Sequence, residues 1–287
     1  MPNKILIISA KNNFASKITN KLSENDYSID ILDIFSDDFK NIDLENAFEK
    51  EKPDCVIYIP CKNSFETSIF KPSSDIEKNI LPLAKILENC KKFNVEKIIL
   101  FSNASIYGDL KNSEIDEKSP KNPTNPYGLS YSLMEEYVQA TAIPYVILRV
   151  SNVYGLEFEP LNENGVVEIF AKKMKENSSI NIFSNGEQKR DFIYIDDVLY
   201  LLIQTLKKDI KNEIINLSTN KSTSINELFE KMSKMYGYKK SPNYLPKRLG
   251  EITNSVLSNK KALKIFDDFK FSDLSDGLIK MKEDIYG

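Results

Sequence analysis

Two tyrosines spaced four residues apart raise the question of what chemistry this sequence supports. Tyr127 and Tyr131 lie in NPYGLSYSLMEEYVQA (125–140), which has the apolar periodicity of a helix. Residues four apart share one helix face. A phenol has a pKa of about 10, so a tyrosine base needs a neighbouring cation, and this stretch has no lysine or arginine. Tyr127 is therefore either a reactive phenol or part of a packing stripe with Tyr131, Met134 and Val138, and the missing cation favours packing.

Composition excludes several kinds of chemistry. The 287 residues contain no histidine, which rules out Ser-His-Asp and Cys-His catalysis and histidine-bound metals. The three cysteines, Cys55, Cys61 and Cys90, lack paired spacing, which argues against a disulfide framework or a zinc site. With 39 basic and 42 acidic residues, no basic field attracts nucleic acid or an anionic membrane. We expect no metal and no nucleic-acid partner.

No apolar run approaches the ~20 residues of a membrane span, and the apolar run at 5–9 is too short for a signal-peptide core. We therefore expect a cytoplasmic protein with no membrane partner.

Short apolar strands alternate with amphipathic helices in the first half of the chain. The predicted strands cover 4–9, 28–33, 55–60, 97–102, 145–150 and 213–218, and the predicted helices cover 14–25, 43–50, 76–93 and 127–141. Continuous apolar strands separated by helices predict an α/β fold with a doubly wound parallel sheet, covered on both faces. We expect a Rossmann-like domain over 1–155, to which 183–220 returns, and a smaller C-terminal α/β substrate domain over 156–287.

Several motifs follow one another along the chain at fixed spacing. They are FSNASIYG (101–108), NPYGLS (125–130), LRVSNVYG (148–155), NIFSNGEQKRDFIYIDDV (181–198) and NLSTNKSTSINEL (216–228). In this order they resemble the extended short-chain dehydrogenase/reductase family, the NAD-dependent nucleotide-sugar epimerases and dehydratases. The resemblance continues to KRLGEITNSVLSNKKALKIF (247–266). It implies a Rossmann-like fold, a bound NAD and a nucleotide-sugar substrate.

The family's cofactor turn has the pattern G-x-x-G-x-x-G between the first strand and the first helix, because glycine lets the pyrophosphate approach the backbone. Here the stretch is SAKNNFA, with Ser9, Asn12 and Ala15 at the three positions. Asp33 stands where the resemblance places the acid that binds the adenosine ribose, although a solvated loop acid is an equal alternative. Lys62 adds bulk after the third strand. We expect NAD to bind weakly or not at all.

The resemblance also implies an acid–base group made of a tyrosine, a lysine four residues later and a Ser or Thr after the fourth strand. Tyr127 matches the tyrosine, Tyr131 replaces the lysine, and Asn103 stands at the Ser/Thr position. An amide cannot relay a proton as a hydroxyl does, and a neutral phenol cannot lower the pKa of Tyr127. The implied catalytic group is therefore degenerate.

The positions that the family uses for its substrate are retained. Asn152, Arg190 and Arg248 match the asparagine and arginines that contact the nucleotide-sugar diphosphate and nucleoside. A guanidinium fork suits phosphate oxygens. The alternative for each arginine is a surface salt bridge, for example with Asp191 or Glu251. We expect a nucleotide-sugar or nucleoside diphosphate as ligand.

Three functions remain open. The first is a family member that binds a nucleotide-sugar with impaired or absent NAD-dependent catalysis, a pseudoenzyme. The second is an active NAD(P)-dependent epimerase, dehydratase or reductase with an atypical cofactor site. The third is an inactive assembly partner, since the resemblance implies a homodimer, or a heterodimer with a relative, formed through 76–93 and 127–141.

Arg149, at the end of a buried strand, is expected to be structural.

Overall fold

A computed structural model describes residues 2–10, 12–34, 42–60, 65–110, 114–159 and 164–286, without the side chains of 65–67 and 286. Cys61 and Lys62, which the sequence analysis singled out, lie outside the described residues. The chain divides into two compact units. Unit 1 comprises 1–106, 125–149 and 199–215, and unit 2 comprises 107–124, 150–198 and 216–287.

A six-stranded sheet forms the centre of unit 1, and its order is β10-β5-β4-β3-β1-β2. The strands are β1 (Lys4–Ser9), β2 (Ser28–Asp33), β3 (Cys55–Tyr58), β4 (Lys97–Asn103), β5 (Tyr145–Val150) and β10 (Glu213–Leu217), and the last two end in unit 2. β1 pairs in parallel with β2 on one side and with β3 on the other. The chain therefore reverses its direction of winding between β1 and β3, where open α/β sheets bind ligands.

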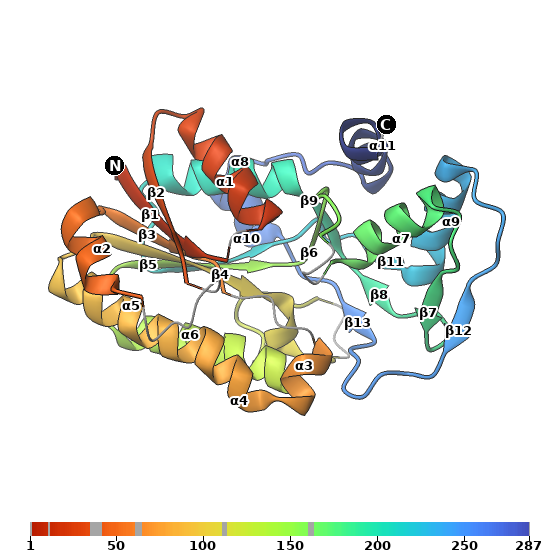
Figure 1. Ribbon diagram of the computed structural model, residues 1–287, viewed down its shortest axis with the longest axis horizontal. Coiled ribbons are helices and arrows are strands. Elements are labelled where there is room, and N and C mark those ends of the chain that lie inside the picture. The colour runs from red at the N-terminus through yellow and green to blue at the C-terminus, as the bar shows by residue number, and fades with distance from the viewer. Residues whose placement is uncertain are drawn as a thin grey trace. The chain divides into compact units, whose positions relative to one another are not determined.

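Helices cover both faces of this sheet, as Figure 1 shows. α1 (Asn13–Ser23) lies on one face, and α5 (Leu81–Lys92) and α6 (Pro126–Ala140) lie on the other. The predicted doubly wound α/β fold is confirmed. Side chains set where the helices begin: the Asn125 side chain accepts a hydrogen bond from Gly128 N, and Pro126 occupies the first turn of α6. α2 (Leu44–Glu51) is capped in the same way by Asp43.

The predicted helix over 76–93 is interrupted. A π-helical turn, Ile76–Ile80, precedes α5, and two short helices, α3 (Phe65–Phe70) and α4 (Pro72–Asp75), come before it. Within this turn, the buried Asn79 amide donates to Asp75 Oδ1 at 3.0 Å, and Tyr58 Oη donates to Asn79 O at 3.1 Å. A π-helical turn contains one residue more than an α-helical turn, so the apolar residues on either side of it no longer follow one α-helical spacing. Regular spacing in the sequence therefore does not reveal such a turn.

Unit 2 consists of short strands and four helices among its described residues. β6 (Asn152–Tyr154) pairs with β9 (Phe192–Tyr194), β7 (Asn181–Phe183) pairs with β12 (Asn243–Leu245), and β8 (Lys189–Arg190) lies between β11 (Thr223–Ser224) and β13 (Asn254–Ser255). The helices are α7 (Val166–Lys175), α9 (Ile225–Tyr236), α10 (Lys260–Ile265) and α11 (Leu274–Tyr286). α8 (Ile195–Lys207) begins in unit 2 and continues into unit 1. A capping box of Ser224 and Glu227 starts α9.

Among the helices that the structure describes, none is long and apolar enough to cross a membrane. The described residues also contain no group of His, Cys, Asp and Glu that would hold a metal ion.

Candidate functional site

The turn between β1 and α1 carries the positions that the sequence analysis assigned to the cofactor. Ser9 ends β1 and is fully buried, with no hydrogen bond to its Oγ among the described residues. Asn12 has an extended backbone, with φ −148° and ψ 169°, so this position does not use the left-handed conformation that glycine favours. Its side chain instead caps the helix, because Oδ1 accepts a hydrogen bond from Ala15 N at 2.8 Å. The cap thus engages one of the first-turn amides that an anion at this helix end would use.

Asp33 lies next to this turn. The β1–β2 register sets Ser9 opposite Asp33 at the carboxyl end of both strands, and Asp33 is half-buried. The structure therefore brings together Ser9 and the acid to which the resemblance assigned ribose binding.

α6 presents the two tyrosines in contact with each other. Their rings meet edge to face, with centroids 5.0 Å apart and planes at 61°. Tyr131 is buried, whereas Tyr127 is half-buried. Asn103 follows the buried part of β4, and its Oδ1 accepts a hydrogen bond from Ser105 N at 2.9 Å, which is a local turn contact. The aromatic pair is the packing that helical spacing predicted, and the catalytic assignment of Tyr127, Tyr131 and Asn103 stays a prediction.

A buried ion pair anchors the same helix. Glu135 on α6 accepts hydrogen bonds from Arg149 Nε at 3.0 Å and from Arg149 Nη2 at 2.7 Å, and Ser102 Oγ donates to it at 2.5 Å. Glu135 and Arg149 are 0% and 2% exposed. The expectation that Arg149 is structural is confirmed. Glu135 was not predicted from the sequence, although an arginine in a buried strand requires a buried partner of opposite charge.

In unit 2 the structure brings Arg190 and Arg248 into one charged cluster. Burial lowers the pKa of Arg190, Glu251 acts to raise it, and Arg248 acts to lower it further. Arg248 stacks on the Phe183 ring, with its guanidinium carbon 4.3 Å from the ring centroid. Its Nη2 also lies 3.7 Å from Glu251 Oε1, the salt bridge that the sequence analysis named as the alternative to ligand binding. Arg248 is thus paired with the buried Glu251. The Arg190 guanidinium donates from Nη1 to Lys189 O at 2.9 Å and feels the charges of Glu251, Arg248 and Asp109.

Gln188 adds a polar group beside this cluster. Its Nε2 donates to Phe183 O at 3.0 Å and contacts Glu251 Oε1 at 3.5 Å. Its buried Oε1 accepts no hydrogen bond among the described residues. A buried acceptor without a donor costs free energy, which a ligand donor would recover.

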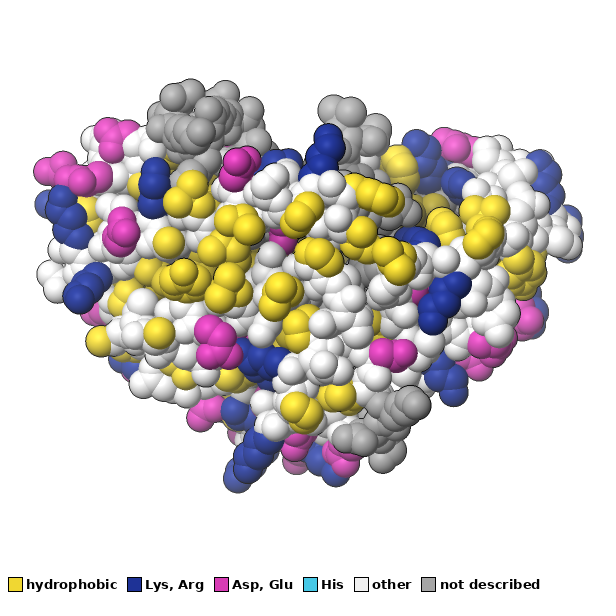
Figure 2. Space-filling view, turned by 90° about the horizontal axis from the view of Figure 1, so that it is seen from below, with side chains coloured by type: hydrophobic (Ala, Val, Ile, Leu, Met, Phe, Trp, Pro, Cys, Tyr) yellow, Lys and Arg dark blue, Asp and Glu magenta, His cyan; other side chains and the backbone are white. Residues whose placement is uncertain are grey.

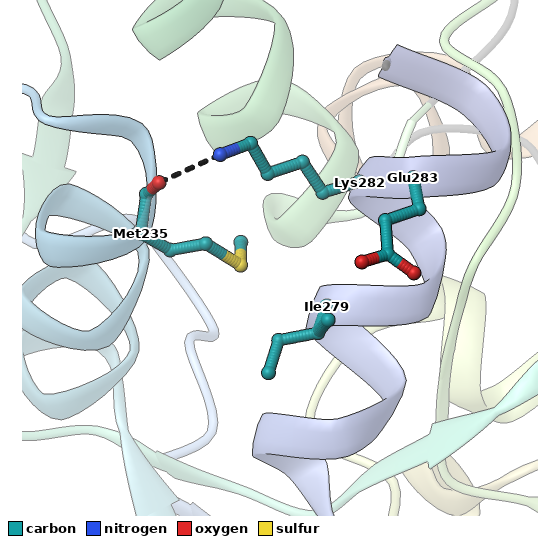
Figure 3. Close-up of a pocket in the computed structure, with 4 residues that line it drawn as sticks. All are labelled: Met235, Ile279, Lys282 and Glu283. Carbon is teal, nitrogen blue, oxygen red and sulfur yellow. Dashed lines mark hydrogen bonds between the residues drawn. The ribbon is translucent and has the colours of Figure 1, made fainter.

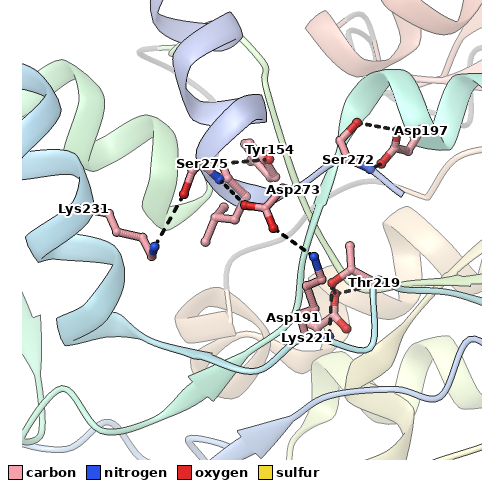
Figure 4. A network of polar contacts seen from close by, with 10 residues as sticks. Tyr154, Asp191, Asp197, Thr219, Lys221, Lys231, Ser272, Asp273 and Ser275 are labelled. Carbon is pink, nitrogen blue, oxygen red and sulfur yellow. Dashed lines mark hydrogen bonds and ion pairs between the residues drawn. The ribbon is translucent and has the colours of Figure 1, made fainter. Parts of the chain in front are cut away.

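Asn152 is hydrogen-bonded to Asp191, the residue that follows Arg190. Its Nδ2 and its backbone N both donate to Asp191 O at 3.0 Å. The Asp191 carboxylate in turn accepts from Thr219 N at 3.0 Å and from Thr219 Oγ1 at 2.8 Å, and Figure 4 shows these two residues. It also accepts from Ser218 Oγ at 2.6 Å. These bonds show how Asp191 is satisfied without the Arg190 salt bridge that the sequence analysis had offered as an alternative.

A shallow cavity of about 250 Å³ lies between α9 and α11. Met235, Ile279, Lys282 and Glu283 line it, and Lys282 Nζ reaches across to donate to Met235 O at 2.8 Å, as Figure 3 shows. None of the residues predicted from the sequence as binding or catalytic lines this cavity.

The parallel sheet of unit 1 and its helices define an α/β protein with a Rossmann-like fold. The NAD dependent epimerase/dehydratase family model matches residues 4–218, and the chain belongs to this family. It is 35% identical over 278 residues to a putative UDP-glucose 4-epimerase of Methanocaldococcus jannaschii, covering 90% of each chain. A UDP-glucose 4-epimerase of Thermotoga maritima, solved with UDP-glucose, superposes with a TM-score of 0.89 at 28% identity and 97% coverage of both chains. A UDP-glucuronic acid 4-epimerase of Bacillus cereus, solved with UDP-glucuronic acid and NAD, gives 0.85 at 26% identity, covering 97% of this chain and 98% of that one.

Proposed function

We propose that this protein binds a nucleoside diphosphate or nucleotide-sugar through unit 2 and has impaired NAD-dependent turnover. The observation that carries the binding part is that Arg248 pairs with Glu251 while Arg190, on the strand that pairs with β13, lies close enough to feel the charges of both. The two guanidinium groups face two carboxylates, those of Glu251 and Asp109, so the formal charges balance. What the cluster offers a diphosphate is the forked N–H donors of two arginines, which suit phosphate oxygens. Stacking on Phe183 orients the Arg248 guanidinium, so less conformational entropy is lost when an anion binds.

The relatives support the same ligand class. The Thermotoga maritima structure is of a UDP-glucose 4-epimerase with UDP-glucose, and the Bacillus cereus structure holds UDP-glucuronic acid. We therefore take UDP as the first probe. Asn152, attached to Asp191 beside Arg190, is the third residue assigned to this ligand.

Impaired cofactor binding is supported by the turn at the start of α1. The Ala15 amide is engaged by Asn12 Oδ1, and the side chains of Ser9 and Asn12 stand where the family's turn has bare backbone. The residues present therefore do not fit a pyrophosphate held by a glycine turn. We infer that NAD binds more weakly here than in relatives with glycines at these positions.

Impaired turnover is supported by the contacts of Tyr127. A tyrosine base requires a cation that lowers its pKa, and the group one turn along the helix is the ring of Tyr131, not an ammonium. The Asn103 side chain is turned to its own loop, where it accepts from Ser105 N. At the positions that the resemblance assigns to the acid–base group, Tyr131 therefore stands in place of the lysine and Asn103 in place of the Ser or Thr.

Binding of the nucleotide is tested by calorimetric titration with UDP and UDP-sugars. Arg190→Ala and Arg248→Ala should each weaken binding by about 1.5–3 kcal/mol, the value of a charge-assisted hydrogen bond. Lys270→Ala, which removes an exposed cation of the same unit, is the matched control and should leave the affinity unchanged. If no UDP compound binds, or if both arginine variants bind as tightly as the parent, the binding proposal is wrong.

The cofactor and turnover parts are tested separately. Parent protein should show no NAD binding in the low micromolar range, and Asn12→Gly should bind NAD more tightly. Tyr131→Lys with Asn103→Ser should restore epimerase or dehydratase turnover only when Asn12→Gly is also present. NAD-dependent turnover of a UDP-sugar by the parent protein would instead establish the second candidate, an active enzyme with an atypical cofactor site, which the family membership favours.

An apolar face of unit 1 supports an additional role in assembly. On the side of the sheet covered by α5 and α6, Figure 2 shows hydrophobic side chains gathered across the surface. They include Phe70, Ile76, Leu81, Leu129, Leu133 and Tyr137, all exposed. A patch of this kind marks a protein interface, so we propose a homodimer, or a heterodimer with a relative. Leu129→Glu with Leu133→Glu should give a monomer by light scattering, whereas Tyr200→Glu, at another exposed ring, should not.

A further inference from the structure

We propose that Asp109 is a positioning residue, whose carboxylate clasps the backbone at Thr253 and Asn254 and so holds the Arg248 segment beside Arg190. The inference rests on the proposed function, because it assigns the clasp to the arginine cluster that would bind a diphosphate. All the residues concerned belong to unit 2.

The clasp is a dense set of hydrogen bonds onto one carboxylate. Asp109 Oδ1 accepts from Thr253 N at 3.0 Å, from Thr253 Oγ1 at 2.6 Å and from Asn254 N at 3.1 Å, and Oδ2 lies 2.7 Å from the same hydroxyl. Residues 109 and 253 are 144 positions apart in the chain. A contact of such long sequence separation fixes the path of the segment it holds.

The clasped segment runs directly into the arginine cluster. Thr253 O accepts from Lys189 N at 2.8 Å, and β13 pairs in parallel with β8, with Ser255 opposite Arg190. On the other side of the clasp, Glu251 N donates to Arg248 O at 3.3 Å, and the Glu251 carboxylate faces Arg248 Nη2. The clasp therefore sits between the strand that carries Arg190 and the turn that carries Arg248.

The chemistry of Asp109 separates a positioning role from ligand contact. Its charge acts on Arg190 together with those of Glu251 and Arg248. Asp109 keeps its negative charge, so it would repel a diphosphate placed directly against it. Its oxygens accept hydrogen bonds from two amides and a hydroxyl of 253–254, so in our proposal it holds this segment while the diphosphate contacts the arginines.

The experiment compares Asp109→Asn with Asp116→Asn in the full chain. Asp116 is the matched control, since it lies in the same segment and its Oδ1 accepts from Lys118 N and Ser119 Oγ within a local turn. Calorimetry with UDP measures affinity, and brief trypsin digestion with mass spectrometry measures cleavage after Lys247 and Arg248. Thermal unfolding without ligand identifies any global loss of fold.

We expect Asp109→Asn to weaken UDP binding about tenfold, which corresponds to about 1.4 kcal/mol, and to speed cleavage after Arg248 at a temperature where the variant is folded. Asp116→Asn should change neither. If the parent binds UDP and Asp109→Asn binds it equally well, the positioning role is wrong. If the parent binds no UDP, the proposed function fails, and the cleavage rates still decide whether Asp109 holds this segment. Should Asp109→Asn not fold, Thr253→Val, which removes only the hydroxyl, takes its place with the same expected directions.

Discussion

Replacing Arg149 by methionine should destabilise the protein more than any change to a surface ion pair. The substitution keeps much of the side-chain volume but leaves the Glu135 carboxylate, which is 0% exposed, with Ser102 as its remaining donor among the contacts described above. Removing one partner of a buried ion pair costs about 3–5 kcal/mol, because the other charge stays buried and uncompensated. A natural domain is stable by about 5–15 kcal/mol, so this is a large fraction of the total.

The cycle of variants separates the charge effect from lost packing. Arg149→Met with Glu135→Leu removes both charges, and such apolar replacements are often neutral or stabilising. The Ser102 hydroxyl would then lose its acceptor, at a cost of about 1–3 kcal/mol, so the set is completed by Ser102→Ala. We expect the triple variant, with Arg149→Met, Glu135→Leu and Ser102→Ala, to regain most of the stability that Arg149→Met alone loses.

Urea unfolding followed by circular dichroism measures these differences, with an unchanged m-value as the sign that only stability has changed. Lys221→Met is the matched control, because it breaks an exposed ion pair of 2.9 Å with Asp273, whose value should stay below about 1 kcal/mol. Our reasoning is refuted if Arg149→Met costs no more than Lys221→Met, or if removing Glu135 and Ser102 as well brings no recovery.

Three further outcomes follow from burial and hydrogen bonding. Burial raises the pKa of the Cys55 thiol to about 12, so a thiol reagent should label it only on unfolding, as mass spectrometry of the labelled peptide will show. Gly277→Ala should destabilise by about 1–3 kcal/mol, since the added methyl would lie 2.0 Å from Tyr154 Oη, and Tyr154→Phe should relieve part of this in thermal unfolding. Burial acts to raise the pKa of Asp109, but hydrogen bonds from 253–254 bring it below its usual 3.8. A carboxyl group whose pKa is lower in the folded than in the unfolded protein stabilises the fold above the unfolded-state pKa, and this stabilisation is lost as the pH falls through the folded-state pKa. Asp109→Asn should therefore lower the free energy of unfolding at neutral pH. In an acid titration the variant should lose less stability than the parent below about pH 4.

The sheet of unit 1 was predictable because most of its strands are continuous apolar runs, and SIDILD at 28–33, the edge strand β2, still carries three apolar residues. The runs at 4–9 and 28–33 became β1 and β2 without change, and the run at 55–60 became β3 with only its last two residues outside the strand. Periodicity failed where the backbone departs from a regular helix. The stretch predicted as one helix over 76–93 begins with a π-helical turn that the buried pair Asp75 and Asn79 accompanies.

The candidate site was predictable only as far as motifs point to single residues. Arg190 and Arg248 were recognised separately, and the structure places them in one cluster with Glu251. Asp109 and Thr253 gave no signal, because a hydrogen-bonded pair 144 residues apart leaves no local pattern. Asn12 was identified as a substitution, but its capping of the Ala15 amide depends on backbone angles that composition does not fix.

Substitutions at the residues discussed above should differ in how far they lower the free energy of unfolding. Glu135 and Arg149 are buried and paired, so a change at either alone should cost several kcal/mol. Tyr131 and Asn12 stand at the positions that the resemblance assigns to a lysine and a glycine, and in the structure Tyr131 packs against Tyr127 while Asn12 caps α1. Both residues make ordinary stabilising contacts in a folded chain without any ligand. At both positions unit 1 therefore uses the side chain for packing or for helix capping.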